Sequence, residues 1–399
     1  MGPRAARASI WREPGMVPLA VMTCAGFSGY ALLLPVAPLW VVGGGAGTAG
    51  AGLVNGVLLL ATVLTQLLVP RALQRFGWGP VLAAGLALLG APGVLMSLGD
   101  ALAPVLVLSA ARGVGFGVLT VTGSAAAAAL VDPDRRGEAI GAYGLAVALP
   151  NLVLLPAGPW IADRLGWAVA FGLSALPVLG IPAALRLAAV LREHHAAAPE
   201  TEDRHPDPGA RLRLLRPMVL LLVVTLAGGA LLTFVPQVVD SAVVAAGGLL
   251  LMGLAGALGR WRVGVLADRH GPQRFLVPLV PLTGVGMAVV AWSVAGVEVR
   301  VPAFLLGMLV VGLCYGALQN LTLVISFAAV ERRDHNLASA VWNIGFDGGT
   351  ALGSVAVGVV AGATSFATAF ALAGLVAAAT LPLALRPRTS SAASRPGAA

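Results

Sequence analysis

Long apolar runs follow one another along almost the whole chain, and they constrain the fold more than any other feature. A helix needs about 20 apolar residues to cross the hydrocarbon core of a bilayer. Runs of this length predict twelve membrane-spanning helices, at 16–40, 51–71, 80–98, 102–130, 137–160, 167–189, 217–239, 243–264, 275–296, 301–329, 337–360 and 365–385. Of the 399 residues, 58% are hydrophobic and 11% are charged. A soluble domain carries roughly 25% charged residues, so the lipid bilayer must be the solvent of this chain.

One long polar stretch divides these runs into two groups of six. It extends from Leu191 to Pro217 and is rich in charged residues and proline, which is typical of a solvated linker. The sequence therefore predicts an all-α membrane protein with twelve transmembrane helices in two pseudo-symmetric six-helix bundles. The N-terminal bundle is expected at 1–189, a cytoplasmic linker at 190–216, and the C-terminal bundle with a short cytoplasmic tail at 217–399.

The basic residues indicate how the chain is oriented. All 25 are Arg, and positive residues are enriched in cytoplasmic loops. If both termini are cytoplasmic, all but three arginines are counted with cytoplasmic segments, four of them (Arg260, Arg262, Arg269 and Arg274) around the end of the eighth span and the loop after it. Arg112 lies within a span, and Arg164 and Arg300 fall outside the cell. We expect a multi-pass protein of the plasma or inner membrane with both termini in the cytoplasm.

Several classes of function are poorly supported by the composition. The net charge of +8 sits in short segments between apolar runs, which is the pattern of membrane topology rather than of a nucleic-acid-binding face. The chain has no Lys, hence no P-loop lysine and no lysine Schiff base. Cys24 and Cys314 are far apart, and all five histidines lie in polar connectors. We therefore predict no enzyme, no cofactor, no metal centre and no nucleic-acid partner.

Four motifs resemble those of the major facilitator superfamily, particularly its twelve-helix drug:proton antiporter and sugar-exporter branches. The most specific is the loop motif Gly264-Val265-Leu266-Ala267-Asp268-Arg269-His270-Gly271-Pro272-Gln273-Arg274. The others are Gly26-Phe27-Ser28-Gly29-Tyr30, Arg112-Gly113-Val114-Gly115-Phe116-Gly117 and Trp342-Asn343-Ile344-Gly345-Phe346-Asp347-Gly348-Gly349. The resemblance covers residues 16 to 385. It implies a secondary active transporter that works by alternating access, as a monomer, most simply exporting a small organic compound in exchange for protons.

The gating loop motif occurs once in each half. Its residues are Gly264, Asp268, Arg269, Gly271 and Arg274 in the second half, and Gln74, Arg75 and Gly77 in the first. In the family the motif's Asp helps to lock the cytoplasmic side shut, and a carboxylate can interact with the N-terminus of a helix. We expect Asp268 to face the start of the fifth span. Gln74 stands where the family usually has Asp, and the fifth span has Leu155-Pro156-Ala157-Gly158-Pro159 in place of the antiporter pattern.

Asp347 and Arg112 are the main candidates for coupling or substrate binding. Asp347 lies about ten residues inside its span, so it is ~15 Å deep, where carboxylates often relay protons. Asn343 is one turn earlier on the same face. Arg112 is equally deep and needs a partner or water, and the resemblance places it in substrate or proton coupling. The alternative is structural: Asp347 bonds a neighbouring helix, and Arg112 is tied to backbone carbonyls.

A second group of polar residues lies on helices that usually face the central cavity in this superfamily: Tyr30, Asn151, Gln237, Tyr315, Gln319 and Asn320. Each can instead form an interhelical hydrogen bond, as polar side chains in membrane helices often do. Together they indicate a mildly polar cavity that suits a neutral or amphiphilic solute. An uptake carrier or facilitator of the same fold remains an alternative, as does a non-transporting receptor or enzyme, for which no catalytic constellation is present.

Overall fold

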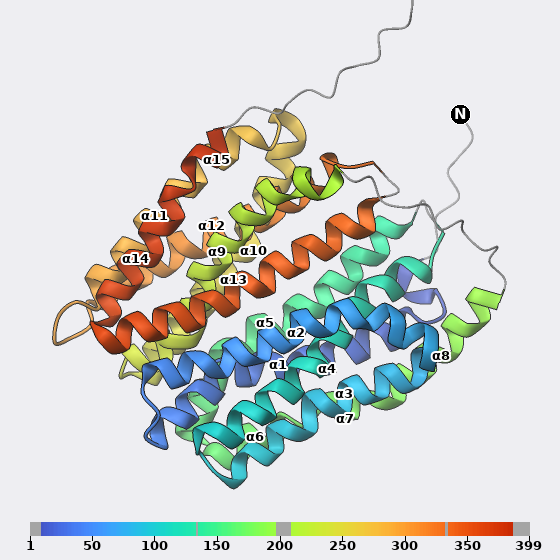
Figure 1. The fold of residues 1–399 in the computed structure, drawn as a ribbon, viewed down its shortest axis with the longest axis horizontal. Helices are drawn as coiled ribbons and strands as arrows, with labels where there is room; N and C mark the ends of the chain where they lie inside the picture. Colours follow the sequence, from blue (N-terminus) through green and yellow to red (C-terminus); the bar gives the residue numbers. More distant parts are fainter. Residues whose placement is uncertain (1–8, 133–134, 197–208, 332–333, 386–399) are drawn as a thin grey trace, which may run out of the picture.

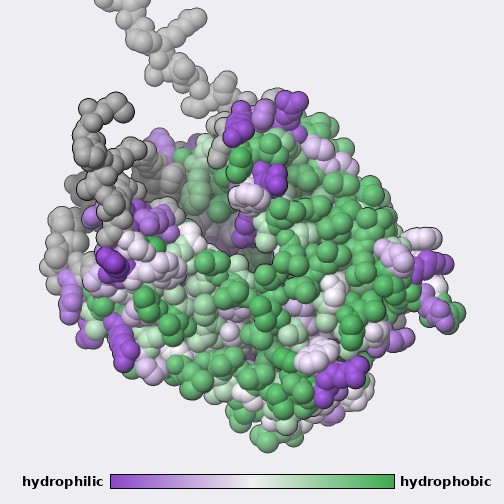
Figure 2. Space-filling view, turned by 180° about the vertical axis from the view of Figure 1, so that it is seen from behind, coloured by the Kyte–Doolittle hydropathy of each residue, from purple (hydrophilic) through white to green (hydrophobic). Residues whose placement is uncertain are grey.

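The computed structural model describes residues 9–132, 135–196, 209–331 and 334–385. Within these ranges the chain is helical and contains no strand. Twelve helical segments are long and apolar enough to cross a membrane, and the outer surface is largely hydrophobic (Figure 2). The predicted fold class, with twelve transmembrane helices, is therefore confirmed.

The first six spans are built from ten elements. They are η1 (Ile10–Arg12), α1 (Met16–Gly43), α2 (Thr48–Phe76), α3 (Trp78–Leu95), η2 (Met96–Leu98), α4 (Leu102–Ala129), α5 (Arg136–Arg164), α6 (Trp167–Leu173), α7 (Leu176–Leu179) and α8 (Ile181–Ala196). The last six are α9 (Ala210–Val238), α10 (Ala242–His270), α11 (Gln273–Ser293), α12 (Val301–Ala328), α13 (His335–Ala363), α14 (Phe366–Ala379) and α15 (Leu381–Leu385). The helices extend into the predicted linker from both sides, and the domain boundaries themselves remain a prediction.

The sixth and twelfth spans are interrupted, although each was predicted as one continuous run. The sixth, from Trp167 to Glu193, consists of α6, α7 and α8. Pro177 lies in α7, and proline lacks the N–H that would continue the hydrogen-bond ladder. Its ring also packs so close to α1 that a Cβ at Gly29 would lie 2.5 Å from Pro177 Cγ. The break therefore lets the sixth span approach α1.

The two bundles meet mainly through two pairs of helices, α2 with α13 and α5 with α10. We call the end of the molecule that holds η1, the start of α9 and α15 the terminus side, and the opposite end, with residues 44–47, 239–241 and 364–365, the far side. Figure 1 shows α2 and α13 close together toward the far side and diverging toward the terminus side.

Hydrogen bonds and buried apolar side chains join the bundles on the far side. Thr48 Oγ1 donates to the carbonyl of Gly358 at 3.0 Å, and Asn55 Nδ2 donates to Thr233 Oγ1 at 2.9 Å. One buried apolar cluster contains residues of both bundles, including Val36 of α1 and Phe234 of α9. Toward the terminus side, the buried clusters belong to one bundle each. The surface is hollowed there, with hydrophilic side chains in and around the hollow (upper part of Figure 2).

Candidate functional site

Asp347 joins the two bundles at mid-depth. It is twelve residues from the start of α13 at His335, or ~18 Å, and only 4% of its surface is exposed. Its Oδ2 accepts a 2.7 Å hydrogen bond from Nε2 of Gln66 on α2. Of the hydrogen bonds described between the bundles, this one lies nearest the terminus side. A charged acceptor makes such a bond stronger than one between neutral groups.

Gln66 was missed by the sequence interpretation. Its amide also donates to Thr120 Oγ1 on α4 at 3.2 Å, while its Oε1 is buried without a partner. It therefore connects α2, α4 and α13 at one point. Its amide within an otherwise apolar part of the 51–71 run was the available signal, since polar groups inside membrane helices usually bond another helix. The residues around Gln66 in the sequence do not indicate which helix its amide contacts.

Aromatic rings of α1 and α4 pack against one another in the same region. The Tyr30 ring of α1 stacks on the Phe116 ring of α4, with centroids 3.8 Å apart, and Phe27 contacts Phe116 edge-on at 5.4 Å. Tyr30 lies within electrostatic range of Asp347, Tyr315 and Arg112. Three predicted site residues, from α1, α12 and α13, are thus brought together around the centre of the molecule.

Arg112 is fully buried, with 0% of its surface exposed. Its Nη2 donates to the carbonyl of Gly29 on α1 at 3.2 Å, and its Nε has no partner. No ion pair within 4.0 Å is described for it in the part of the chain that the structure covers. This bond to a backbone carbonyl is the contact expected if Arg112 has a structural role. It fixes α4 against α1 directly beside Tyr30.

Arg260 also belongs to this central region, although the sequence interpretation counted it among the cytoplasmic loop arginines. The helix α10 continues to His270, so Arg260 lies ten residues before its end, or ~15 Å inside. Its Nη2 donates to Oε1 of Gln319, which is 1% exposed. Tyr315 lies near Gln319 and interacts electrostatically with both Arg260 and Asp347. Arg260 therefore lies within α10 and inside the predicted span 243–264, although the arginine count grouped it with the following cytoplasmic segment.

The other predicted polar residues make local contacts. The amides of Asn151, Gln237 and Asn343 each donate to a carbonyl one turn earlier in their own helix, at 2.8, 2.9 and 2.9 Å. Asn320 donates to the backbone carbonyl of Arg260 at 3.1 Å and so fixes α12 against α10. Of these, only Asn320 contacts another helix through a described hydrogen bond.

The gating loop motifs lie at the terminus side. Gly77 and Gly271 follow α2 and α10 with φ of 77° and 81°, a conformation that favours glycine. Gln74, Arg75, Arg269 and Arg274 are exposed, and the Arg75 guanidinium lies 5.3 Å from the Phe76 ring centroid. Gly264 faces the Asn320 amide. The side chain of Asp268 lies outside the described residues, so the predicted contact with the start of the fifth span remains a prediction.

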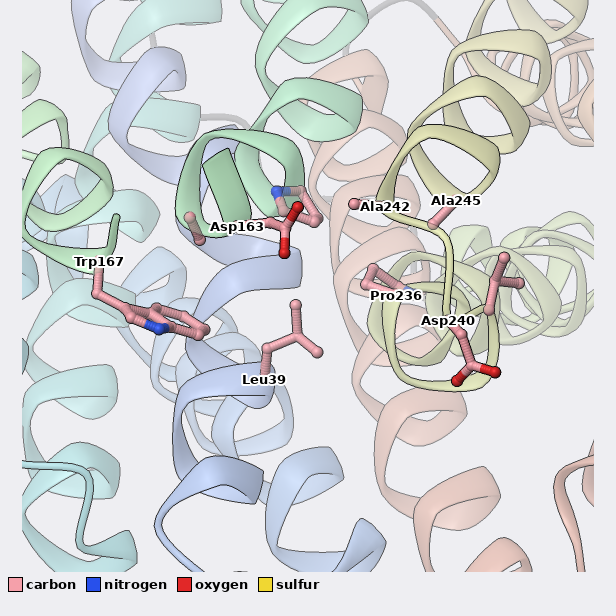
Figure 3. A pocket seen from close by; sticks show the side chains of 10 residues that line it. Leu39, Asp163, Trp167, Pro236, Asp240, Ala242 and Ala245 are labelled. Atoms are coloured by element: carbon pink, nitrogen blue, oxygen red, sulfur yellow. The ribbon is translucent and has the colours of Figure 1, made fainter. Parts of the chain in front are cut away.

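A separate cavity of about 300 Å³ lies on the far side, between the bundles. Figure 3 shows Asp163 and Trp167 on one side of it and Asp240, Ala242 and Ala245 on the other. None of the central residues described above lines it. It marks the far-side contact between the bundles rather than the central site.

Two relatives resemble the chain over part of their length. It is 26% identical over 273 residues to the "Probable 4-methylmuconolactone transporter" of Cupriavidus pinatubonensis, covering 63% of this chain and 61% of the relative. It is 30% identical over 253 residues to an "MFS-type efflux pump" of Mycolicibacterium smegmatis, covering 58% and 57%. The chain thus spans about three fifths of these two relatives. The "Inner membrane transport protein YdhP" of Escherichia coli is 26% identical, with 76% of each chain covered.

Solved structures share the fold at low sequence identity. A peptide transporter solved in complex with sulfate matches with a TM-score of 0.74, at 15% identity and over 95% of both chains. An inward-facing bacterial homologue of the human lysosomal transporter Spinster matches with a TM-score of 0.68, at 14% identity and over 95% of both chains. The family model of the Major Facilitator Superfamily matches residues 19–328 and 263–399. The chain therefore belongs to the Major Facilitator Superfamily, a family of membrane transporters.

Proposed function

We propose that this protein is a proton-coupled exporter of a small organic compound that works by alternating access. The observation that carries the proposal is the hydrogen bond between Gln66 and Asp347, because it places a buried carboxylate at the contact between the bundles. The efflux pump among the relatives supports export. We further propose that the protein acts as a monomer in the inner membrane, with bundles at 1–189 and 217–399 joined by a cytoplasmic linker at 190–216.

A proton on Asp347 would change how the bundles are held together. The ionised carboxylate accepts the N–H of Gln66, and this charge-assisted bond favours the far-side contact. Once protonated, Asp347 loses the charge that strengthens the bond and itself becomes a donor. The unpartnered Oε1 of Gln66 can accept that new O–H after rotation of the amide. Proton binding therefore biases the relative stability of two conformations, which is what coupling requires.

With the termini in the cytoplasm, the far-side contact closes the outer face. The conformation described is then inward-facing, with the hollow of Figure 2 open to the cytoplasm. The positive-inside distribution of arginine supports this orientation. Export requires that the solute enters from this side, that the terminus side closes, and that the far side opens.

Transport into inverted membrane vesicles tests the proposal. We expect a panel of organic compounds to contain one that accumulates when a proton gradient is imposed. Asp347→Asn should abolish gradient-driven accumulation while counterflow exchange without a gradient persists. Asp163→Asn, a matched change at an exposed far-side carboxylate, should retain accumulation. If Asp347→Asn still accumulates substrate at the wild-type rate, Asp347 is not the proton carrier; accumulation only in right-side-out vesicles would instead identify an uptake carrier.

A further inference from the structure

Of the three charged side chains Asp347, Arg112 and Arg260, only Arg260 is exposed. Asp347 and Arg112 are buried, with 4% and 0% of their surface exposed. Arg260 and Asp347 lie at similar depth, ~15 and ~18 Å from the terminus-side ends of their helices. A charge at this depth must face water or a partner.

The environment of Arg260 leaves its charge uncompensated. An arginine is always protonated and presents five N–H donors in a planar fork. One hydrogen bond is described for this guanidinium, to the neutral Oε1 of Gln319. None of the ion pairs described within the covered ranges includes Arg260. Among the described contacts, the other N–H groups of this guanidinium are therefore available to bind an oxyanion.

Gln319 supplies a second, independent indication of a ligand. Its side chain is 1% exposed, its Oε1 is held by Arg260, and its Nε2 is buried without a hydrogen-bond partner. A buried donor without an acceptor costs about 1–3 kcal/mol. Tyr315 lies near this side chain and interacts electrostatically with Arg260. Guanidinium, amide and phenol donors thus converge at one place, and an acceptor with two oxygens satisfies them together.

Apolar rings adjoin these donors. The Tyr315 ring lies 6.3 Å from that of Phe346, which stacks on Trp342 at 5.6 Å. All three are only partly buried. This row on α12 and α13 offers a surface for a planar or apolar body next to the charged fork. The arrangement suits a solute with one anionic end and one aromatic or aliphatic end.

We propose that Arg260, together with Gln319 and Tyr315, binds the carboxylate of an organic monoanion whose apolar body lies against Tyr315, Phe346 and Trp342. The inference rests on the proposed transport of a small organic compound and narrows its chemical class. It differs from the expectation of a neutral or amphiphilic solute, which rested on a mildly polar cavity. A bidentate carboxylate matches the guanidinium fork in geometry and charge.

Binding to the purified full-length protein in lipid nanodiscs tests this proposal without requiring transport. The probes are matched sets that share a body and differ in charge: phenylacetate, phenylacetamide and phenethylamine, and the corresponding naphthyl compounds. We expect at least one carboxylate to bind more tightly than its amide and amine by about tenfold, the value of one charge-assisted hydrogen bond. Failure of every carboxylate to bind, or equal binding across each set, overturns the proposal.

Two arginine variants then test whether Arg260 is the residue that binds the carboxylate. Arg260→Gln should lower carboxylate affinity about tenfold or more and leave the weaker amide affinity unchanged. Arg262→Gln is the matched control, because Arg262 lies two residues away with its guanidinium 4.8 Å from the Trp261 ring centroid. Equal losses in both variants would show a non-specific effect of positive charge and refute the site. If the carboxylate preference depends on Arg260 but a proton gradient drives no transport, the proposed coupling fails and the binding site stands.

Discussion

At the scale of single residues, the centre of the molecule contains an acidic and a basic side chain in different environments. Asp347 is buried and bonded to Gln66, so it suits a proton rather than a bulky ligand. Arg260 is exposed and incompletely bonded, so it suits an anion. Tyr315 interacts with both. A proton site and a substrate site connected by one phenol can influence each other without sharing an atom.

Substitutions of Arg112 can show whether transport requires the guanidinium group at this buried position or only a positive charge. Its guanidinium donates to the Gly29 carbonyl at 3.2 Å and thereby fixes α4 against α1. Lysine keeps the charge but not the planar fork, so Arg112→Lys should reduce transport at least about tenfold and Arg112→Ala should abolish it. The measurement is initial transport rate at equal amounts of folded protein. Arg164→Lys, at an exposed arginine, is the control; wild-type transport by Arg112→Lys would show that positive charge alone suffices.

At the scale of helices, close approach between α2 and α13 depends on glycine. A Cβ at Gly52 would lie 2.2 Å from the carbonyl oxygen of Ser354, and one at Gly56 would lie 2.3 Å from Val355 Cγ2. Ser354 also bonds Thr233, which accepts from Asn55. The far-side contact therefore combines backbone-to-backbone packing with a buried chain of hydrogen bonds, as is common where membrane helices meet through small residues.

Gly52→Ala should prevent tight far-side closure. A methyl group cannot occupy space 2.2 Å from a backbone oxygen, so α2 and α13 must separate there and the far-side-open conformation gains population. Each 1.4 kcal/mol lost from closure shifts the ratio of conformations about tenfold. A cysteine replacing Ala242, which lines the far-side cavity, reports the change by its rate of thiol labelling. Gly43→Ala is the control because nothing lies within 4 Å of a Cβ there; equal labelling in both variants would contradict the argument.

The sequence predicted the membrane-spanning helices, because the bilayer requires apolar runs of a certain length. It did not predict the contacts between helices. The depth of Asp347 follows from counting residues along one helix, since each adds about 1.5 Å. Its partner Gln66 is 281 residues away, and the register between α2 and α13 depends on packing that no local pattern records. Arg260 was counted with the cytoplasmic segment although it falls within the predicted span 243–264, and α10 continues past it to His270. Breaks in the sixth span depended on how Pro177 packs against α1.

At the scale of the whole molecule, the two faces are held by different means. The far side is joined by hydrogen bonds and by an apolar cluster that includes both bundles. Between Gln66 and the end of α2 at Phe76, no described hydrogen bond reaches the other bundle. Closure of the terminus side in the alternative conformation must therefore use groups that are apart in this one. The two gating loop motifs lie at that end, after α2 and α10.

The two motifs differ, and the difference predicts that only one of them stabilises the closed terminus side through a carboxylate. The motif's carboxylate is present as Asp268 in the second half, and it is replaced by Gln74 in the first. A carboxylate at the start of a helix contributes about 0.3–1 kcal/mol when exposed and up to ~2 kcal/mol when partly buried. Gln74 is exposed on α2 and offers only a neutral amide to the start of α13 near Leu337. Closure of the terminus side should consequently depend on Asp268 and the start of α5 near Glu138.

Gln74→Asp should strengthen closure of the terminus side, and Asp268→Asn should weaken it. A gain of 1 kcal/mol shifts the ratio of conformations about fivefold. The measurement is thiol labelling from the terminus side of a cysteine that replaces Asn343, which lies between Asp347 and that end of α13, in a background lacking Cys24 and Cys314. Labelling should slow with Gln74→Asp and accelerate with Asp268→Asn, whereas Gln74→Asn, which adds no charge, should leave it unchanged. Because added charge acts through screened electrostatics, the effect of Gln74→Asp should also diminish at high salt. If labelling is the same in Asp268→Asn and wild type, the carboxylate does not hold this side closed, whatever the transport rate.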